Sequence, residues 1–122
     1  MSIVIIILQI IIALGIYNVW LIRPQKKTPY RGGNTSSIKE EFSAYGLPTW
    51  FMYAVGMIKV LSATGLIVGI WIPVLTVPSA IVLLVMMMGA LTMHVKIHDT
   101  FKQTAPALGM FVLLVGMLFL IS

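Results

Sequence analysis

The sequence contains no cysteine, and only three of its 122 residues are acidic. The absence of cysteine excludes disulfide exchange, thiolate nucleophiles and thiolate metal sites, and with them the four-helix membrane thiol oxidoreductases as functional models. Charged residues make up 9% of the chain, whereas hydrophobic residues make up 60%. So few polar side chains cannot cover the surface of a soluble domain. The composition therefore predicts a small integral membrane protein.

The formal charge of +5 does not indicate a nucleic-acid partner. Five of the eight lysines and arginines fall within residues 23–48, and Lys96 and Lys102 lie together between the last two apolar runs. Basic residues concentrated in short connectors beside apolar runs follow the positive-inside rule of membrane proteins. No RNA-type aromatic motif accompanies them. We therefore expect the lipid bilayer, and no nucleic acid, as a partner.

Four apolar runs are long enough to cross a bilayer. They cover residues 3–22, 49–71, 75–94 and 104–121, and the polar connector 23–48 separates the first two. At about 1.5 Å of rise per residue, each run forms a helix about 27–35 Å long, close to the thickness of the hydrocarbon core. A helix also satisfies its own backbone polar groups inside lipid. The predicted fold is all-α, a transmembrane four-helix bundle formed by a single domain over residues 1–122.

A short amphipathic helix is predicted inside the polar connector, between the first and second spans. Ser37 and Glu40 have the spacing of a capping box, which favours a helix start at this point. Ile38, Phe42 and Tyr45 then fall on one helical face before a glycine and a proline end the element. We expect this helix to lie at the membrane interface with its apolar face inward.

A single lysine, Lys59, lies near the middle of the second run, whose ends carry Trp50 and Trp71. Tryptophan favours both membrane interfaces, and a mid-membrane ammonium costs about 2.5–3.5 kcal/mol on insertion scales. Lys59 therefore needs an acceptor. Glu41 is the preferred carboxylate, unless it stays solvated at the surface. Two interpretations of Lys59 remain open: a structural cation, or a member of a ligand or proton site.

The face of the helix that carries Lys59 is small and faintly polar, as a packing surface or cavity wall would be. On a helical projection it contains Met52, Val55, Gly56, Ser62, Ala63 and Leu66. In the first span, Gln9, Ala13 and Tyr17 recur at helical spacing. This polar stripe predicts a seam of hydrogen bonds between helices rather than a pore lining, which would need more polar groups.

Two pairs of glycines predict close helix contacts. Gly65 and Gly69 have the small-xxx-small spacing that lets helices approach, and Gly109 and Gly116 are seven residues apart on one face of the last run. In the alternative of a structural or chaperone-like protein, these faces would pack on another membrane protein or on a second copy of the chain. Thr104 is the predicted cap of the last helix.

His94 and His98 are four residues apart and would share a helical face, as metal-binding pairs do, if the helix continued through both. A third ligand would have to come from Asp99 or Glu41, and no second histidine pair exists. No metal site is therefore predicted. His94 is either a hydrogen-bonding group at a pocket mouth or an ordinary interfacial residue.

The distribution of basic residues predicts the orientation. The first and third connectors carry the lysines and arginines, the second carries none, and an even number of spans places the first and third connectors on one side. By the positive-inside rule that side is cytoplasmic. We expect a multi-pass protein of the cell inner membrane with both termini outside.

Several short motifs, taken in order, resemble the DoxX-like family of small four-helix membrane proteins. They are Asn18 with Trp20-Leu21, Tyr30-Arg31-Gly32-Gly33-Asn34, Glu41-Phe42, Tyr45-Gly46-Leu47-Pro48, Gly56 with Lys59, Gly69-Ile70-Trp71-Ile72-Pro73, and Gly89-Ala90 with His94. The resemblance implies a four-helix bundle in a membrane and a loose association with respiratory or redox chemistry. Relatives include a subunit linked to quinone-dependent thiosulfate oxidation and a member of a membrane oxidoreductase complex. Distant eukaryotic relatives look like assembly chaperones for other membrane proteins.

Taken together, these observations favour an accessory membrane protein that binds a small lipophilic molecule, a quinone or a lipid, inside the bundle. The expected ligand-binding residues are Lys59, Glu41, His94, Tyr45, Gly56 and Asn18. Lys59 would donate a hydrogen bond, Glu41 would balance its charge, and His94 would give or accept a proton. No nucleotide-binding or haem motif is present, so any electrons would be carried by another membrane or redox subunit, and no catalytic residue is assigned. The alternatives are a structural or chaperone-like protein, which includes a homo-oligomer, and a small proton-coupled transporter.

Overall fold

The computed structural model describes residues 3–22 and 37–121, and this part of the chain contains only helices and turns. The elements are α1 (Ile3–Tyr17), a π-helical continuation of α1 (Asn18–Ile22), α2 (Ile38–Ala44), α3 (Thr49–Val68), a 3₁₀ turn (Pro73–Leu75), α4 (Thr76–Lys96) and α5 (Phe101–Ile121). Four segments are long and apolar enough to cross a membrane, namely Ile3–Leu21, Thr49–Val68, Pro73–Lys96 and Phe101–Ile121. The predicted all-α fold with four candidate spans is confirmed. The motif at residues 30–34 lies outside the described residues.

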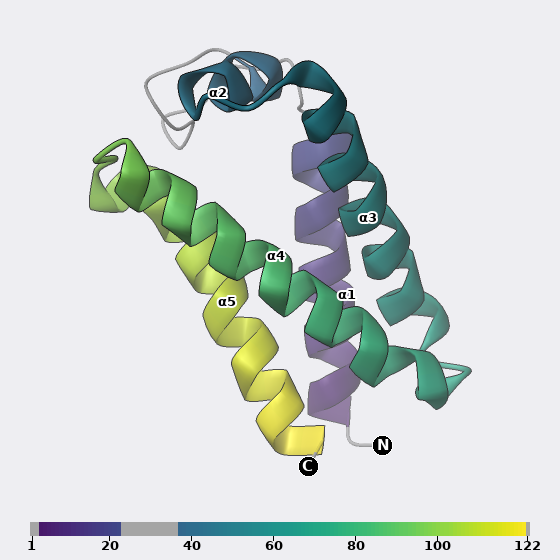
Figure 1. Cartoon of the computed structure of the whole chain (residues 1–122). Helices are drawn as coiled ribbons and strands as arrows, with labels where there is room; N and C mark the ends of the chain where they lie inside the picture. Colours follow the sequence, from purple (N-terminus) through teal and green to yellow (C-terminus); the bar gives the residue numbers. More distant parts are fainter. Residues whose placement is uncertain (1–2, 23–36, 122) are drawn as a thin grey trace.

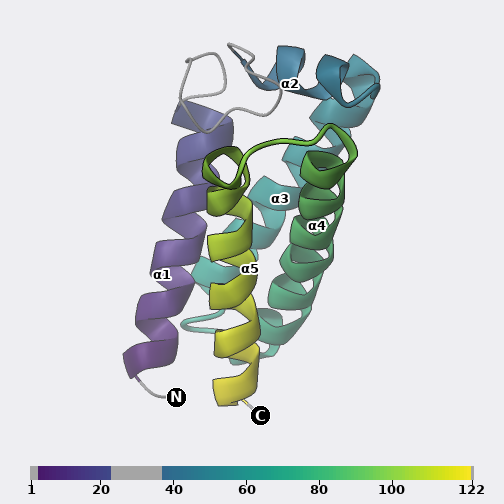
Figure 2. The same cartoon turned by 90° about the vertical axis from the view of Figure 1, so that its left-hand side faces the viewer.

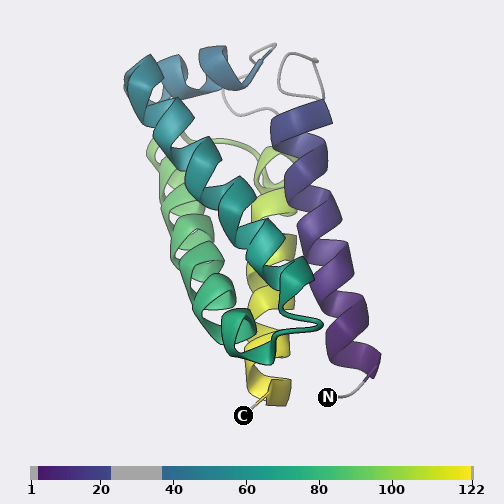
Figure 3. The same ribbon diagram turned by 90° about the vertical axis from the view of Figure 1, so that its right-hand side faces the viewer.

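The four long helices form an up-and-down bundle. α1 packs against α3 and α5, and α4 packs against the same two helices, so the order around the bundle is α1, α3, α4, α5. Figures 2 and 3 show neighbouring helices running in opposite directions. In Figure 1, α2 crosses one end of the bundle, whereas α1 begins and α5 ends at the opposite end. The end of α1 and the start of α3 therefore lie at the α2 end, together with the end of α4 and the start of α5 (Figure 1).

The core is apolar and receives side chains from all four long helices. Its fully buried members include Ile12 of α1, Leu66 of α3, Leu83 of α4, and Leu114 and Met117 of α5. The outer surface is equally apolar, with side chains such as Phe119 and Trp71 more than 70% exposed. A protein with so much exposed apolar surface is stable only when lipid covers it.

The polar stripe of α1 forms the predicted hydrogen-bonded seam with its neighbours. Gln9 is completely buried, and its Nε2 donates to the carbonyl oxygen of Leu66 at 2.9 Å and to Oγ1 of Thr76 at 3.1 Å. One end of the seam is closed by the hydroxyl groups of Tyr17 and Thr64, which lie 2.7 Å apart. These bonds join α1 to α3 and to the start of α4, at places where side chains have no water to bond with.

The paired glycines of α3 pack inside the chain. A Cβ atom on Gly65 would collide with Ser79 of α4, and one on Gly69 would collide with Thr76. The prediction that this pair contacts another protein or a second copy is therefore wrong, because the tight α3–α4 turn already covers it. By contrast, no described atom lies within 4 Å of a Cβ atom built on Gly109 or Gly116.

The helix boundaries differ from the predicted ones where capping was misread. The last helix begins at Phe101, not at residue 104, because Thr100 is the cap. Its Oγ1 accepts from the backbone N–H of Gln103 at 3.3 Å, and Oε1 of Gln103 accepts from the N–H of Thr100 at 3.0 Å. This is a capping box in which glutamine replaces glutamate. The second span ends at Val68, not at Trp71, and the third runs on to Lys96.

α2 has the predicted amphipathic form and lies across the end of the bundle. Oγ of Ser37 accepts from the N–H of Glu40 at 3.2 Å, which is half of the predicted capping box. Ile38 and Tyr45 are buried, whereas Lys39 between them is exposed. The helix ends at Ala44, and Gly46, with a φ of 80°, closes a Schellman motif that residues other than glycine adopt only with strain. α2 therefore leads into α3 through a fixed turn.

Candidate functional site

The buried cation predicted in the second span is present. Lys59 is 8% exposed, and it shares the inward face of α3 with Met52, Gly56, Ala63 and Leu66, as the helical projection indicated. Its Nζ lies 5.3 Å from the centre of the Trp20 ring, within the range of a cation–π contact. The ammonium is thus held inside the bundle, beside an aromatic ring from α1, and not at the lipid boundary.

Gly56 allows Trp20 to occupy this position. A Cβ atom on Gly56 would lie 2.6 Å from Cε3 of Trp20, so the indole ring packs directly on the α3 backbone. Trp20 belongs to the π-helical segment that begins at Asn18. Such segments are rare and occur frequently at functional sites. The half-buried Asn18 therefore belongs to the element that positions Trp20.

A row of aromatic rings links Trp20 to the far side of the bundle end. The ring of Phe42 lies 5.9 Å from that of Trp20 and 5.8 Å from that of Tyr45. Tyr45 in turn contacts the imidazole of His94 edge to face, with the ring centres 6.0 Å apart. Phe42 lies in α2, and Tyr45 directly follows its last residue. The segment formed by α2 and Tyr45 therefore connects the ring beside Lys59 with His94.

His94 is paired with a carboxylate. Its Nδ1 lies 2.7 Å from Oδ2 of Asp99, and the two side chains are only 6% and 3% exposed. The pairing depends on how α4 ends. His98 adopts a left-handed conformation with φ of 57°, and the N–H of Asp99 then turns back to bond the carbonyl oxygen of His94 at 3.0 Å. Because the helix ends before His98, the two histidines do not share a helical face.

α4 is also joined directly to α2 at this end of the bundle. Nζ of Lys96 donates to the carbonyl oxygen of Tyr45 at 2.9 Å. Tyr45 thus contacts α4 twice, through its ring and through its backbone. Within the described residues, no group of three or more histidine, cysteine, aspartate or glutamate side chains is placed to hold a metal ion.

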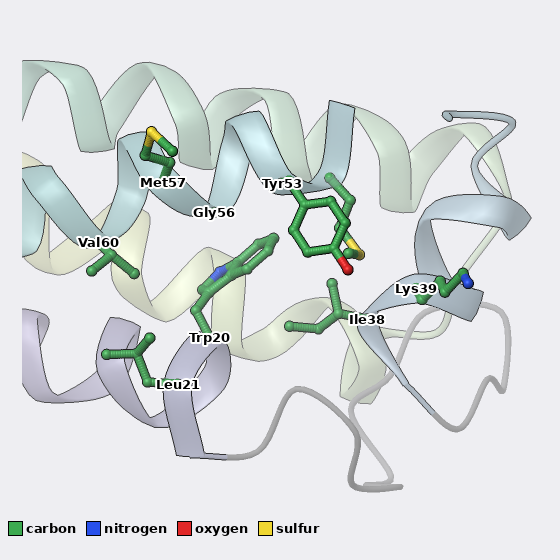
Figure 4. A pocket seen from close by; sticks show the side chains of 9 residues that line it. Trp20, Leu21, Ile38, Lys39, Tyr53, Gly56, Met57 and Val60 are labelled. Atoms are coloured by element: carbon green, nitrogen blue, oxygen red, sulfur yellow. The ribbon is translucent and has the colours of Figure 1, made fainter. Parts of the chain in front are cut away.

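A cavity of about 400 Å³ opens between the end of α1, α2 and the start of α3 (Figure 4). It is lined by Trp20, Leu21, Ile38, Lys39, Met52, Tyr53, Gly56, Met57 and Val60. Among the predicted ligand-binding residues, Gly56 lines this cavity. Lys59 does not line the cavity. Trp20 lies between the two, because its ring forms part of the cavity wall and contacts the ammonium of Lys59.

The other predicted residues lie around the same end of the bundle. Tyr45 and His94 contact each other but do not line this cavity, and neither does Asn18. Glu41 lies in α2, and its side chain is outside the described part of the structure. The common site of Lys59, Glu41, Tyr45 and His94 therefore stays a prediction.

Sequence reasoning missed two residues that the structure brings into the site. Trp20 contacts Lys59 and lines the cavity, and Asp99 pairs with His94. For Trp20, the available signal was its position two residues after Asn18 at the polar end of the first span. Asp99 lies five residues after His94, and this spacing indicates a contact between the two side chains only when a helix ends between them.

Four apolar helices of membrane-spanning length, with an apolar outer surface and a buried cation near the middle of one of them, define a multi-pass membrane protein. Within that class, the chain belongs to the DoxX-like family, whose model matches residues 33–117. The match includes Lys59, Gly56, Tyr45 and His94 but begins after the first span, so Trp20 lies outside it. Comparisons with curated proteins and with solved structures gave no match.

Proposed function

We propose that this protein binds a lipophilic molecule from the bilayer, a quinone or a lipid, as an accessory of a membrane redox system. The observation that carries the proposal is the cavity of about 400 Å³ whose wall residue, Trp20, lies against the buried ammonium of Lys59. Small-molecule sites in proteins have volumes of about 300–1,000 Å³ and are mostly apolar with a few polar groups. This cavity has both properties.

The lining fits a flexible apolar guest. Met52 and Met57 are unbranched and polarizable, so they adapt to ligands of different shape. Leu21 and Val60 extend the apolar wall along the two long helices. The cavity lies where these helices meet α2, so a molecule enters it from the lipid without crossing the bundle core.

Lys59 supplies the polar part of the proposed site. A carbonyl oxygen of the ligand, from a quinone or from a lipid ester, accepts a hydrogen bond from the ammonium when the Trp20 ring moves aside, because the cation–π contact is weaker than a charge-assisted hydrogen bond. In this proposal Glu41 balances the charge of Lys59. His94, which is paired with Asp99 at the end of α4, gives or accepts a proton.

Fluorescence of Trp20 tests the proposal. In a Trp50→Phe, Trp71→Phe background, Trp20 is the remaining tryptophan, and a short-chain quinone bound in the cavity is expected to quench it. Val60→Phe fills the cavity and is expected to weaken the quinone affinity about tenfold. Lys59→Met, which removes the ammonium, is expected to weaken it about fivefold.

Leu61→Phe is the matched control, because Leu61 is 64% exposed and does not line the cavity. It is expected to bind the quinone as the parent does. Equal affinities in the Val60→Phe and Leu61→Phe proteins would contradict binding at this place.

The orientation is part of the proposal. Lys39, Lys96 and Lys102 are exposed at the α2 end of the bundle, and the basic residues of 23–36 lie in the connector between α1 and α2. The positive-inside rule supports a cytoplasmic location for this end, with both termini outside, in the cell inner membrane.

A structural or chaperone-like role is the second candidate, and one observation favours it. Gly109 and Gly116 lie on α5, with no described atom near either Cβ position, so this helix offers a narrow face to a partner. Replacing both with leucine is expected to abolish any cross-linked complex formed through α5. An unchanged cross-linking pattern in the Gly109→Leu, Gly116→Leu protein would exclude this face as the contact.

A further inference from the structure

The cavity between α1, α2 and α3 is polar at one end and apolar at the other. Figure 4 shows Lys39 and the hydroxyl of Tyr53 towards one end, and Leu21, Met57 and Val60 towards the other. Along α3, Tyr53 and Val60 are about 10 Å apart at 1.5 Å of rise per residue. The polar end is therefore near the start of α3, and the apolar end is deeper in the span.

The polar end carries a positive charge. Lys39 is exposed on α2, which lies outside the four candidate spans, so its ammonium is at the level of the lipid head groups. Among the nine lining residues that the structure describes, none carries a carboxylate. The site thus offers one cation and one phenolic hydroxyl to a ligand group at the membrane surface, and both groups donate hydrogen bonds to oxygen.

We propose that the occupant of this cavity is a membrane lipid with an anionic head group. Its phosphate contacts Lys39 and Tyr53, and one of its acyl chains lies along Met57, Val60 and Leu21. Charge complementarity and the order of polar and apolar groups with depth both support this occupant. A zwitterionic lipid offsets its phosphate with a cation of its own, and a quinone carries no negative charge to pair with the ammonium of Lys39. The inference rests on the proposed function, because it requires that the cavity takes up a molecule from the bilayer.

Quenching by brominated lipids tests the inference on the full chain. The Trp50→Phe, Trp71→Phe protein is placed in phosphatidylcholine vesicles that contain either brominated phosphatidylcholine or brominated phosphatidylglycerol at the same mole fraction. Brominated chains quench a tryptophan that they touch. The anionic lipid is expected to occupy the site about fivefold more readily than the neutral one, which is the factor expected for one basic residue at an anionic surface.

Two lysine variants separate a specific site from a general charge effect. Lys39→Gln is expected to remove the preference for the anionic lipid and to leave quenching by neutral lipid in place. Lys102→Gln makes the same change of charge at the same end of the bundle but outside the cavity lining, and it is expected to keep the preference.

Each other result overturns the inference. Equal quenching by both lipids excludes a head-group site at Lys39, and so does an equal loss of the preference for the anionic lipid in both lysine variants. Either result is still compatible with a lipid in the cavity. If neither brominated lipid quenches Trp20 more in the parent than in the Val60→Phe protein, no lipid enters the cavity, and the lipid arm of the proposed function fails as well.

Discussion

Gly56→Ala is expected to lower the free energy of unfolding by up to about 2 kcal/mol and to weaken ligand binding about tenfold. The added methyl group would lie 2.6 Å from Cε3 of Trp20, so the indole ring must shift by most of an ångström. Overpacking of this kind costs about 1–3 kcal/mol, and the better helix propensity of alanine offsets about 1 kcal/mol of it. Because Trp20 forms the cavity wall and contacts Lys59, one shift affects both the cavity and the cation.

Gly109→Ala is the matched control, since it makes the same change in a helix where no described atom lies within 4 Å of the new methyl group. This variant is expected to stabilise the protein by about 0.5–1 kcal/mol through helix propensity alone. Unfolding in mixed micelles followed by circular dichroism measures both changes. A stabilising effect at both positions would show that Trp20 does not pack against Gly56.

Asp99→Ala is expected to lower the free energy of unfolding by about 2–4 kcal/mol. Asp99 is the partner of a buried imidazole, with Oδ2 2.7 Å from Nδ1 of His94 and both side chains less than 10% exposed. Removing one partner of a buried hydrogen bond costs about 1–3 kcal/mol, and more when the bond involves a charged group. Asp99→Asn, which keeps one acceptor oxygen, is expected to lose about half as much.

His98→Ala is the control for this pair. Its side chain is exposed, and alanine keeps a residue other than glycine at the left-handed position, so the change in stability is expected to stay within about 0.5 kcal/mol. The same unfolding measurement compares the three variants. A loss in the Asp99→Ala protein no larger than that in the His98→Ala protein would mean that the His94–Asp99 contact does not hold α4 in place.

The sequence predicted those features that depend on the local periodicity of one segment. The four spans follow from apolar runs of sufficient length, and the inward position of Lys59 follows from its helical spacing to Met52, Gly56 and Leu66. The amphipathic α2 and the polar stripe of α1 that carries the buried Gln9 were predicted in the same way. Each of these properties belongs to a single helix, so no knowledge of its neighbours was needed.

The features that sequence reasoning missed depend on how two segments meet. The position of Trp20 over Lys59 requires both the π-helical turn of α1 and the absence of a side chain at Gly56. The His94–Asp99 pair requires a helix end that the sequence does not mark with glycine, because His98 adopts the left-handed conformation in its place. Likewise, Gly65 suits an internal contact as well as an external one, and only the fold shows that α4 covers it.

α1 begins and α5 ends at the same end of the four-helix bundle (Figure 1). Two copies encoded in tandem would therefore insert with the same polarity, and no extra crossing would be needed between them. Gene duplication would turn this protein into a parallel repeat, in contrast to the inverted repeats of many transporters. Two such four-helix units joined in one chain would thus place both α2 ends on the same side of the membrane.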